Sequence, residues 1–96
     1  MDIKTVEEAV ALIKLRKGDV TIRTSARATY KTKDNRQIPC FRIALVMGRD
    51  FAIWIVQPNG ASFEFEDFRK RYQIADKFSM EERAALLQSQ QPRQPK

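Results

Sequence analysis

The chain has 96 residues, the length of one small domain, and a globular composition of 43% hydrophobic and 31% charged residues. Its 18 Lys and Arg against 12 Asp and Glu give a net charge of +6, which favours an acidic partner. Histidine is absent and Cys40 is the one cysteine, which excludes His-based triads, Cys/His zinc sites and internal disulfides. No stretch has the roughly 18 apolar residues of a membrane span, and a lone cysteine fits a reducing compartment. We therefore expect a cytoplasmic protein that makes no contact with a membrane.

The first predicted element is a helix over residues 6–17. Thr5 and Glu8 form a capping-box pattern, in which each side chain accepts a backbone hydrogen bond that the first turn leaves free. Apolar residues then recur at helical spacing as far as Ile13, and Gly18 ends the run.

From Asp19 the hydrophobic period becomes two, which predicts a half-buried strand up to Tyr30, followed by a turn over 33–36 and a second strand from about 38 to 47. If Asp34 and Asn35 form a two-residue loop, Arg27 faces Arg42, Ala28 faces Phe41 and Ala26 faces Ile43. The apolar sets then share one inner face, against which we expect the first helix to pack. The predicted inner face consists of Ile22, Ala26, Phe41, Ile43, Ile53 and Ile55.

Two further strands are predicted over 51–57 and 61–65, because Gly-containing turns over 48–50 and 58–60 separate them from their neighbours. The four strands form an antiparallel meander.

Acidic residues after the last strand begin a helix at about residue 66, and Ser79 with Glu82 forms a second capping box that begins a last helix. The chain is polar and basic from Gln88 onward. We therefore predict an α+β fold class, with an N-terminal helix, a four-stranded antiparallel β-meander and two C-terminal helices. The expected organisation is a single domain over 1–87 and a disordered polar and basic tail over 88–96.

Positive charge is concentrated in the first predicted hairpin and the turn after it. Residues 18–50 hold seven Lys and Arg against three Asp, a surplus of +4. Cations on a regular sheet surface suit phosphate contacts, although an exposed strand face is polar in any case. Arg23, Arg27, Lys31 and Arg42 share the predicted outer face. The candidate nucleic-acid-binding residues are Arg23, Arg27, Lys31, Arg36, Arg42, Arg49 and Trp54.

Trp54 is predicted on the outer face beside Arg42, where its ring could stack on an unpaired base. The last hairpin leaves two alternatives. A two-residue loop at 59–60 places Phe63 and Phe65 beside Trp54, in a patch that the C-terminal helices would cover. A three-residue loop turns both phenylalanines inward and leaves Trp54 open.

No catalytic constellation is present in the sequence. Cys40 is predicted on the outward set beside Arg42, which favours its thiolate, but no histidine can activate it. The acidic pairs are explained by helix starts and strand exteriors. We expect no catalytic residue, cofactor or metal, and therefore no enzyme.

The sequence thus predicts a small, basic, non-enzymatic nucleic-acid-binding domain, weakly sequence-selective, that takes single or double strands. A meander followed by a helix resembles several single-strand-binding sheets in outline, without their signature residues. The alternative is a protein–protein interaction module, an inhibitor or adaptor of the kind that phages and other mobile elements encode. Such a module would present its sheet face or edge to an acidic protein surface, or self-associate as a homodimer.

Overall fold

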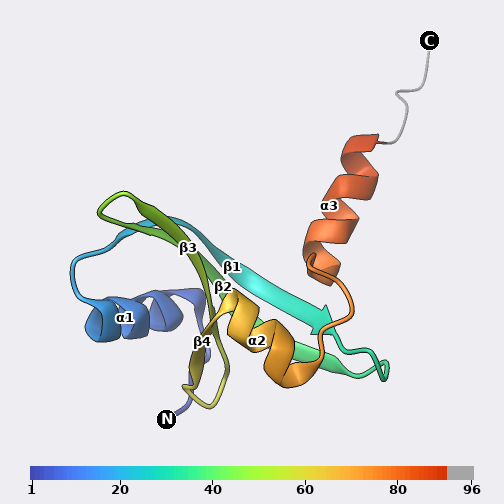
Figure 1. The fold of residues 1–96 in the computed structure, drawn as a ribbon, viewed down its shortest axis with the longest axis horizontal. Coiled ribbons are helices and arrows are strands. Elements are labelled where there is room, and N and C mark those ends of the chain that lie inside the picture. Colours follow the sequence, from blue (N-terminus) through green and yellow to red (C-terminus); the bar gives the residue numbers. More distant parts are fainter. Residues whose placement is uncertain (91–96) are drawn as a thin grey trace.

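A computed structural model describes residues 1–90 and confirms the predicted fold class (Figure 1). The four strands form one antiparallel sheet in chain order. Helix α3 extends three residues past residue 87, and the rest of the predicted tail, 91–96, lies outside the described residues. The elements are α1 (Val6–Lys17), β1 (Thr21–Lys31), β2 (Gln37–Met47), β3 (Asp50–Val56), β4 (Ser62–Glu64), α2 (Phe65–Tyr72) and α3 (Met80–Gln90).

The helices begin where the sequence predicts. Glu8 N–H donates to Thr5 Oγ1 at 3.0 Å and Thr5 N–H donates to Glu8 Oε1 at 3.1 Å, which completes the first capping box. Ser79 and Glu82 make the same reciprocal pair at the start of α3. No helix within residues 1–90 is long and apolar enough to cross a membrane.

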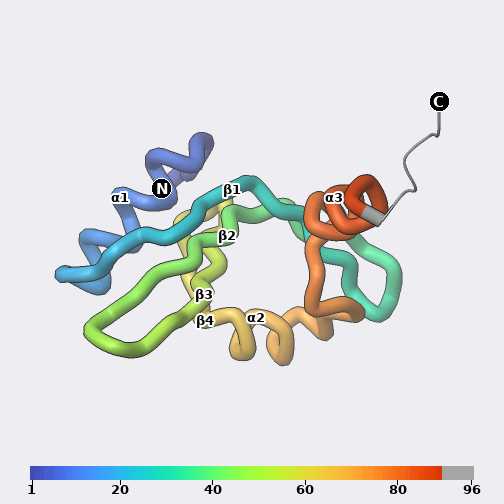
Figure 2. The backbone as a smooth tube through the Cα atoms, turned by 90° about the horizontal axis from the view of Figure 1, so that it is seen from above, coloured from blue at the N-terminus to red at the C-terminus, as the bar shows by residue number. Residues whose placement is uncertain are grey.

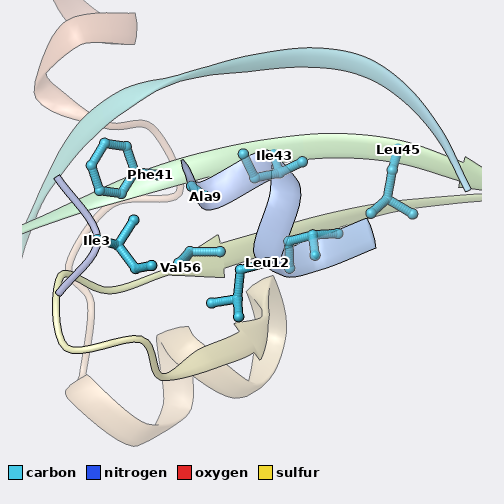
Figure 3. Packing of buried hydrophobic residues seen from close by; sticks show 8 residues of the cluster. Ile3, Ala9, Leu12, Phe41, Ile43, Leu45 and Val56 are labelled. Carbon is cyan, nitrogen blue, oxygen red and sulfur yellow. The ribbon is translucent and has the colours of Figure 1, made fainter. Parts of the chain in front are cut away.

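The sheet has a core on each face, because α1 and α2 lie on opposite sides of the strands (Figure 2). We call these sides the α1 face and the α2 face. Figure 3 shows residues of β2 and β3 packed against α1. The α1-face core consists of Ile3, Ala9, Leu12, Ile13, Phe41, Ile43, Leu45 and Val56. The α2-face core consists of Ala28, Tyr30, Cys40, Ile55, Phe65, Phe68 and Ile74.

The first hairpin closes with a three-residue loop, Lys33–Asn35, and not with the predicted two-residue loop. Thr32 N–H donates to the Arg36 carbonyl at 2.9 Å, and Asn35 takes the left-handed φ of 71° that such a loop needs at its third position. The register therefore shifts by one residue, so that Phe41 lies opposite Arg27. The predicted pairs of Arg27 with Arg42, Ala28 with Phe41 and Ala26 with Ile43 are wrong.

Strand β1 changes face at a β-bulge between Ile22 and Thr24. Ile22 lies opposite Leu45 and packs on the α1-face core, whereas Thr24 and the residues that alternate with it lie on the α2 face. The apolar residues of β1 before the bulge therefore pack on the α1-face core and those after it on the α2-face core, although the same alternation of side chains runs through both parts. The predicted inner face is therefore wrong in part: Ile22, Phe41 and Ile43 belong to the α1 face, but Ala26, Ile53 and Ile55 lie on the α2 face.

The last hairpin adopts the three-residue alternative, Pro58–Gly60. Gly60 N–H donates to the Gln57 carbonyl at 2.9 Å, and Gly60 has a φ of 89° that glycine adopts without strain. This loop places Phe63 opposite Ile55, on the α2 face.

Candidate nucleic-acid interface

The α2 face is covered at one end of the sheet and open at the other. The β2–β3 hairpin extends past the end of α2, with α1 on its far side (Figures 1 and 2). Three rungs of paired residues cross β1, β2 and β3 on this part of the face. We call this surface the open end; it consists of Thr21, Val46 and Phe51 in the first rung, Thr24, Ala44 and Ile53 in the second, and Ala26 and Arg42 in the third.

Phe51 is the feature of the open end that needs an explanation. Its side chain is 63% exposed, and it is the one aromatic among the large exposed hydrophobic residues of 1–90. The sequence predicted Phe51 inward, on the same face as Ile53, and the structure instead leaves both on the face that α2 only partly covers. A ring held on a pleated surface, with the apolar side chains of Val46 and Ile53 beside it, is suited to stack on a nucleic-acid base.

Three of the predicted cations lie in the segments that form or border this surface. Arg23 is exposed at the bulge of β1, and Arg49 is exposed in the β2–β3 turn next to Phe51. Within residues 1–90 neither takes part in an ion pair. Asp50 is in register with Met47 and so belongs to the α1 face, away from this surface.

Arg42 lies at the border between the open end and the covered end. Its Nη2 is 3.6 Å from Glu82 Oε2 in the first turn of α3, and its side chain is 26% exposed. A phosphate at this position would replace Glu82 as the partner of the guanidinium. Because the ion pair is long and partly solvated, that exchange costs little.

The other predicted cations lie elsewhere. Arg27 is on the α1 face, where its guanidinium donates to the Lys4 carbonyl and lies 5.1 Å from the centroid of the Phe41 ring. Lys31 lies at the far end of β1, and Arg36 is bridged to Asp34 at 3.0 Å in the first hairpin. Of the predicted cations, Arg42 therefore lies in the third rung of the open end, Arg23 at the bulge of β1 and Arg49 in the β2–β3 turn, whereas Arg27, Lys31 and Arg36 lie elsewhere.

Trp54 lies opposite Ile43 on the α1 face, and not beside Arg42 as predicted. Its ring is half-buried against the core, and Lys17 Nζ sits 3.6 Å from the ring centroid. A cation already occupies this aromatic surface. The exposed aromatic ring of the sheet is Phe51.

Two titratable side chains, Cys40 and Tyr30, are buried at the covered end of the α2 face. Cys40 is 4% exposed, and burial, with a smaller effect of the Glu81 charge, raises the pKa of its thiol to about 12. The predicted preference for the thiolate is therefore wrong, because the thiol stays protonated at neutral pH. Burial and the Glu82 charge raise the pKa of Tyr30, whose hydroxyl has no hydrogen-bond partner in the described part of the chain.

Comparisons of the chain with models of known families, with curated proteins and with solved structures find no match. The functional assignment therefore depends on the geometry of the open end.

Proposed function

We propose that the protein is a non-enzymatic nucleic-acid-binding domain that holds a single strand on the open end of its sheet. Phe51 stacks on a base, while Arg23, Arg42 and Arg49 contact phosphates. The observation that carries the proposal is the 63% exposure of Phe51 on a sheet surface bordered by arginines. A cytoplasmic location and the absence of catalysis stay predictions.

A single strand fits this surface better than a duplex does. A base can lie flat on Phe51 only when it is released from its neighbours, which gives a stacking energy of about 1–3 kcal/mol. Phosphate contacts fix the position of the strand and read no sequence. The side chains nearest Phe51 on this face are the apolar Val46, which is in register with it, and Ile53, which do not select one base edge; Thr21 and Thr24 lie one strand further away. Binding is therefore weakly sequence-selective.

Fluorescence anisotropy of labelled single-stranded DNA, single-stranded RNA and duplex DNA tests the proposal over a salt series. Three phosphate contacts on a single strand give a slope of about −2 in the logarithm of affinity against the logarithm of salt. We therefore expect roughly 20-fold weaker binding when salt rises from about 50 to 200 mM. Absence of binding at low salt overturns the proposal, and tighter binding of the duplex overturns the stacking role of Phe51.

A further inference from the structure

Strand β1 forms one edge of the sheet, because β2 is its one neighbouring strand. Directly opposite residues of antiparallel strands alternate between pairs that exchange hydrogen bonds and pairs whose N–H and C=O groups point away from each other. Thr29 lies opposite Pro39, which has no N–H, so its backbone groups point outward, and its N–H indeed donates to Glu81 Oε1 at 2.7 Å. Because the register is regular after the bulge, Ser25 and Arg27 also direct their backbone groups outward.

Hydrogen-bond partners cover only the far end of this edge. The Lys31 carbonyl accepts from the Ala75 N–H at 2.8 Å, and the N–H and hydroxyl of Thr29 donate to one carboxylate at the start of α3. In Figure 1, α3 stands beside this end of β1. The outward groups of Ser25 and Arg27 have no such partner within residues 1–90. A strand of 11 residues, about twice the average length, thus presents an unpaired edge on which another strand can form.

The charged side chains of β1 are all positive. Arg23, Arg27 and Lys31 are exposed, and within residues 1–90 none of them takes part in an ion pair. Asp19 precedes the strand, and the Glu81 carboxylate is already bound at the far end of the edge. Two copies of this edge would bring like charges together, which disfavours self-pairing. A partner strand that carries carboxylates complements the same row of cations.

The side chains of β1 indicate the pattern of a matching strand. Arg27 lies on the α1 face, where one N–H of its guanidinium donates to the Lys4 carbonyl and others are left for a carboxylate. Thr24 and Ala26 lie on the α2 face and are short and exposed. Directly opposite residues share a face, so an acidic residue fits opposite Arg27 and an apolar, β-branched residue fits beside Ala26.

We propose that the edge of β1 over residues 24–28 binds an extended acidic segment of another protein as an additional antiparallel strand. The backbone groups of Ser25 and Arg27 supply the main-chain hydrogen bonds, and Arg23 and Arg27 attract the carboxylates. The acidic residues opposite Ser25 and Arg27 direct their own N–H and C=O toward β1, whereas the residues between them direct theirs toward solvent. The proposal does not depend on what the open end binds.

Fluorescence anisotropy of a labelled hexapeptide, in which glutamate alternates with valine, tests the proposal on the full chain freed of nucleic acid. We expect binding that weakens roughly tenfold or more when glutamine replaces each glutamate. A methyl group on the backbone nitrogen of the middle glutamate should weaken binding roughly tenfold, because it removes a hydrogen bond to β1. The same methyl group on the middle valine should leave the affinity within about twofold, since that N–H faces solvent.

Two results of the peptide experiment overturn the proposal. Absence of binding by the glutamate–valine peptide shows that the edge takes no acidic strand. Equal losses from the two methylated peptides show that charge alone, and not strand pairing, holds the peptide.

The matched protein variants are Ser25→Pro and Ser25→Ala. Proline removes the outward N–H and is tolerated in an edge strand where that N–H faces solvent, whereas alanine keeps it. We expect Ser25→Pro to bind the glutamate–valine peptide roughly tenfold more weakly and Ser25→Ala to bind it like the wild type. Urea unfolding shows whether both variants stay folded, and the methylated peptides decide if Ser25→Pro does not. Equal affinities of two folded variants overturn the proposal.

A labelled single-stranded oligonucleotide distinguishes a peptide from a phosphate backbone as the occupant of this edge. Its affinity should be the same for Ser25→Pro and Ser25→Ala, because the edge N–H is not part of the open end. If Ser25→Pro weakens oligonucleotide binding by the same factor as peptide binding, the edge holds phosphates and its assignment to an acidic strand is wrong.

Discussion

The two ends of the α2 face belong to the same strands and differ in what covers them. At the covered end Tyr30, Ile55 and Phe68 are fully buried, and Arg69 is paired with Glu66. At the open end Phe51 is 63% exposed and the neighbouring arginines Arg23 and Arg49 have no carboxylate partner within residues 1–90. One sheet surface thus packs against a helix at one end and leaves an aromatic ring exposed at the other, where we propose that a single strand binds.

The short length of α2 explains why only one end of the α2 face is covered. Helix α2 has 8 residues, about 12 Å at the rise of an α-helix, whereas the 11 residues of β2 span about 36 Å. A helix one third as long as the strand beneath it covers only part of the apolar face. Phe51 is left largely exposed, although Ala44 is buried and Val46 and Ile53 are half-buried. The predictions below test whether the two ends have the separate roles that this contrast implies.

The largest effect is expected for Phe68→Ala at the covered end. Phe68 is fully buried, with its ring 5.5 Å from that of Tyr30 and 5.3 Å from that of Tyr72. Removal of the ring leaves a cavity and should lower the free energy of unfolding in urea by about 3–5 kcal/mol. The matched change Phe51→Ala should cost less than about 0.5 kcal/mol, because an exposed ring contributes little. A loss below about 1 kcal/mol for Phe68→Ala would show that α2 does not cover the sheet in solution.

The second prediction compares two pairs of arginines. The double change Arg23→Gln with Arg49→Gln removes two of the proposed phosphate contacts at the open end, and should make the salt slope shallower by about 1.4. Affinity at low salt should fall uniformly across sequences, because phosphate contacts carry no base information. Arg27→Gln with Arg36→Gln removes equal charge elsewhere and should leave the slope within about 0.5 of the wild type. Equal slopes for the two double variants would mean that net charge alone, and not the open end, drives binding.

The smallest effect is expected for Tyr30→Phe. The Tyr30 hydroxyl is buried and has no hydrogen-bond partner in the described residues, so its removal relieves an unsatisfied group. The free energy of unfolding should stay the same or rise by up to about 1 kcal/mol, and the affinity for a single strand should not change. A fall of more than about 1 kcal/mol in urea unfolding would show that the hydroxyl is bonded, with Arg42 the nearest candidate.

Local signals predicted most of the fold, because helix ends and turns depend on residues close in the chain. The capping boxes at Thr5 and Ser79 and the turn glycines mark element boundaries correctly. The register depends instead on whether Lys33 belongs to the loop, and a one-residue difference moves every side chain to the other face. The bulge at Arg23 cannot be recognised in the sequence, because the alternation of apolar and polar residues in β1 continues through it.

The missed signal at the site lies in β2 and β3. Both strands are apolar at successive positions, which is typical of strands covered on both faces. That pattern would have predicted a helix on each side of the sheet and removed the argument for an outward Trp54. It could not have shown that Phe51 stays exposed, because this depends on where α2 docks as well as on its length. Of the candidate site residues, the sequence identified Arg23, Arg42 and Arg49 and missed Phe51.

The affinity of Phe51 variants for a labelled single strand tests the role of the open end most directly. Phe51→Tyr keeps an aromatic ring on the sheet, whereas Phe51→Ala removes it, and neither should shift the urea midpoint. We expect Phe51→Ala to bind about 5- to 150-fold more weakly than the wild type, the equivalent of one lost stacking contact, and Phe51→Tyr to bind normally. Wild-type affinity in Phe51→Ala would contradict the proposed binding surface.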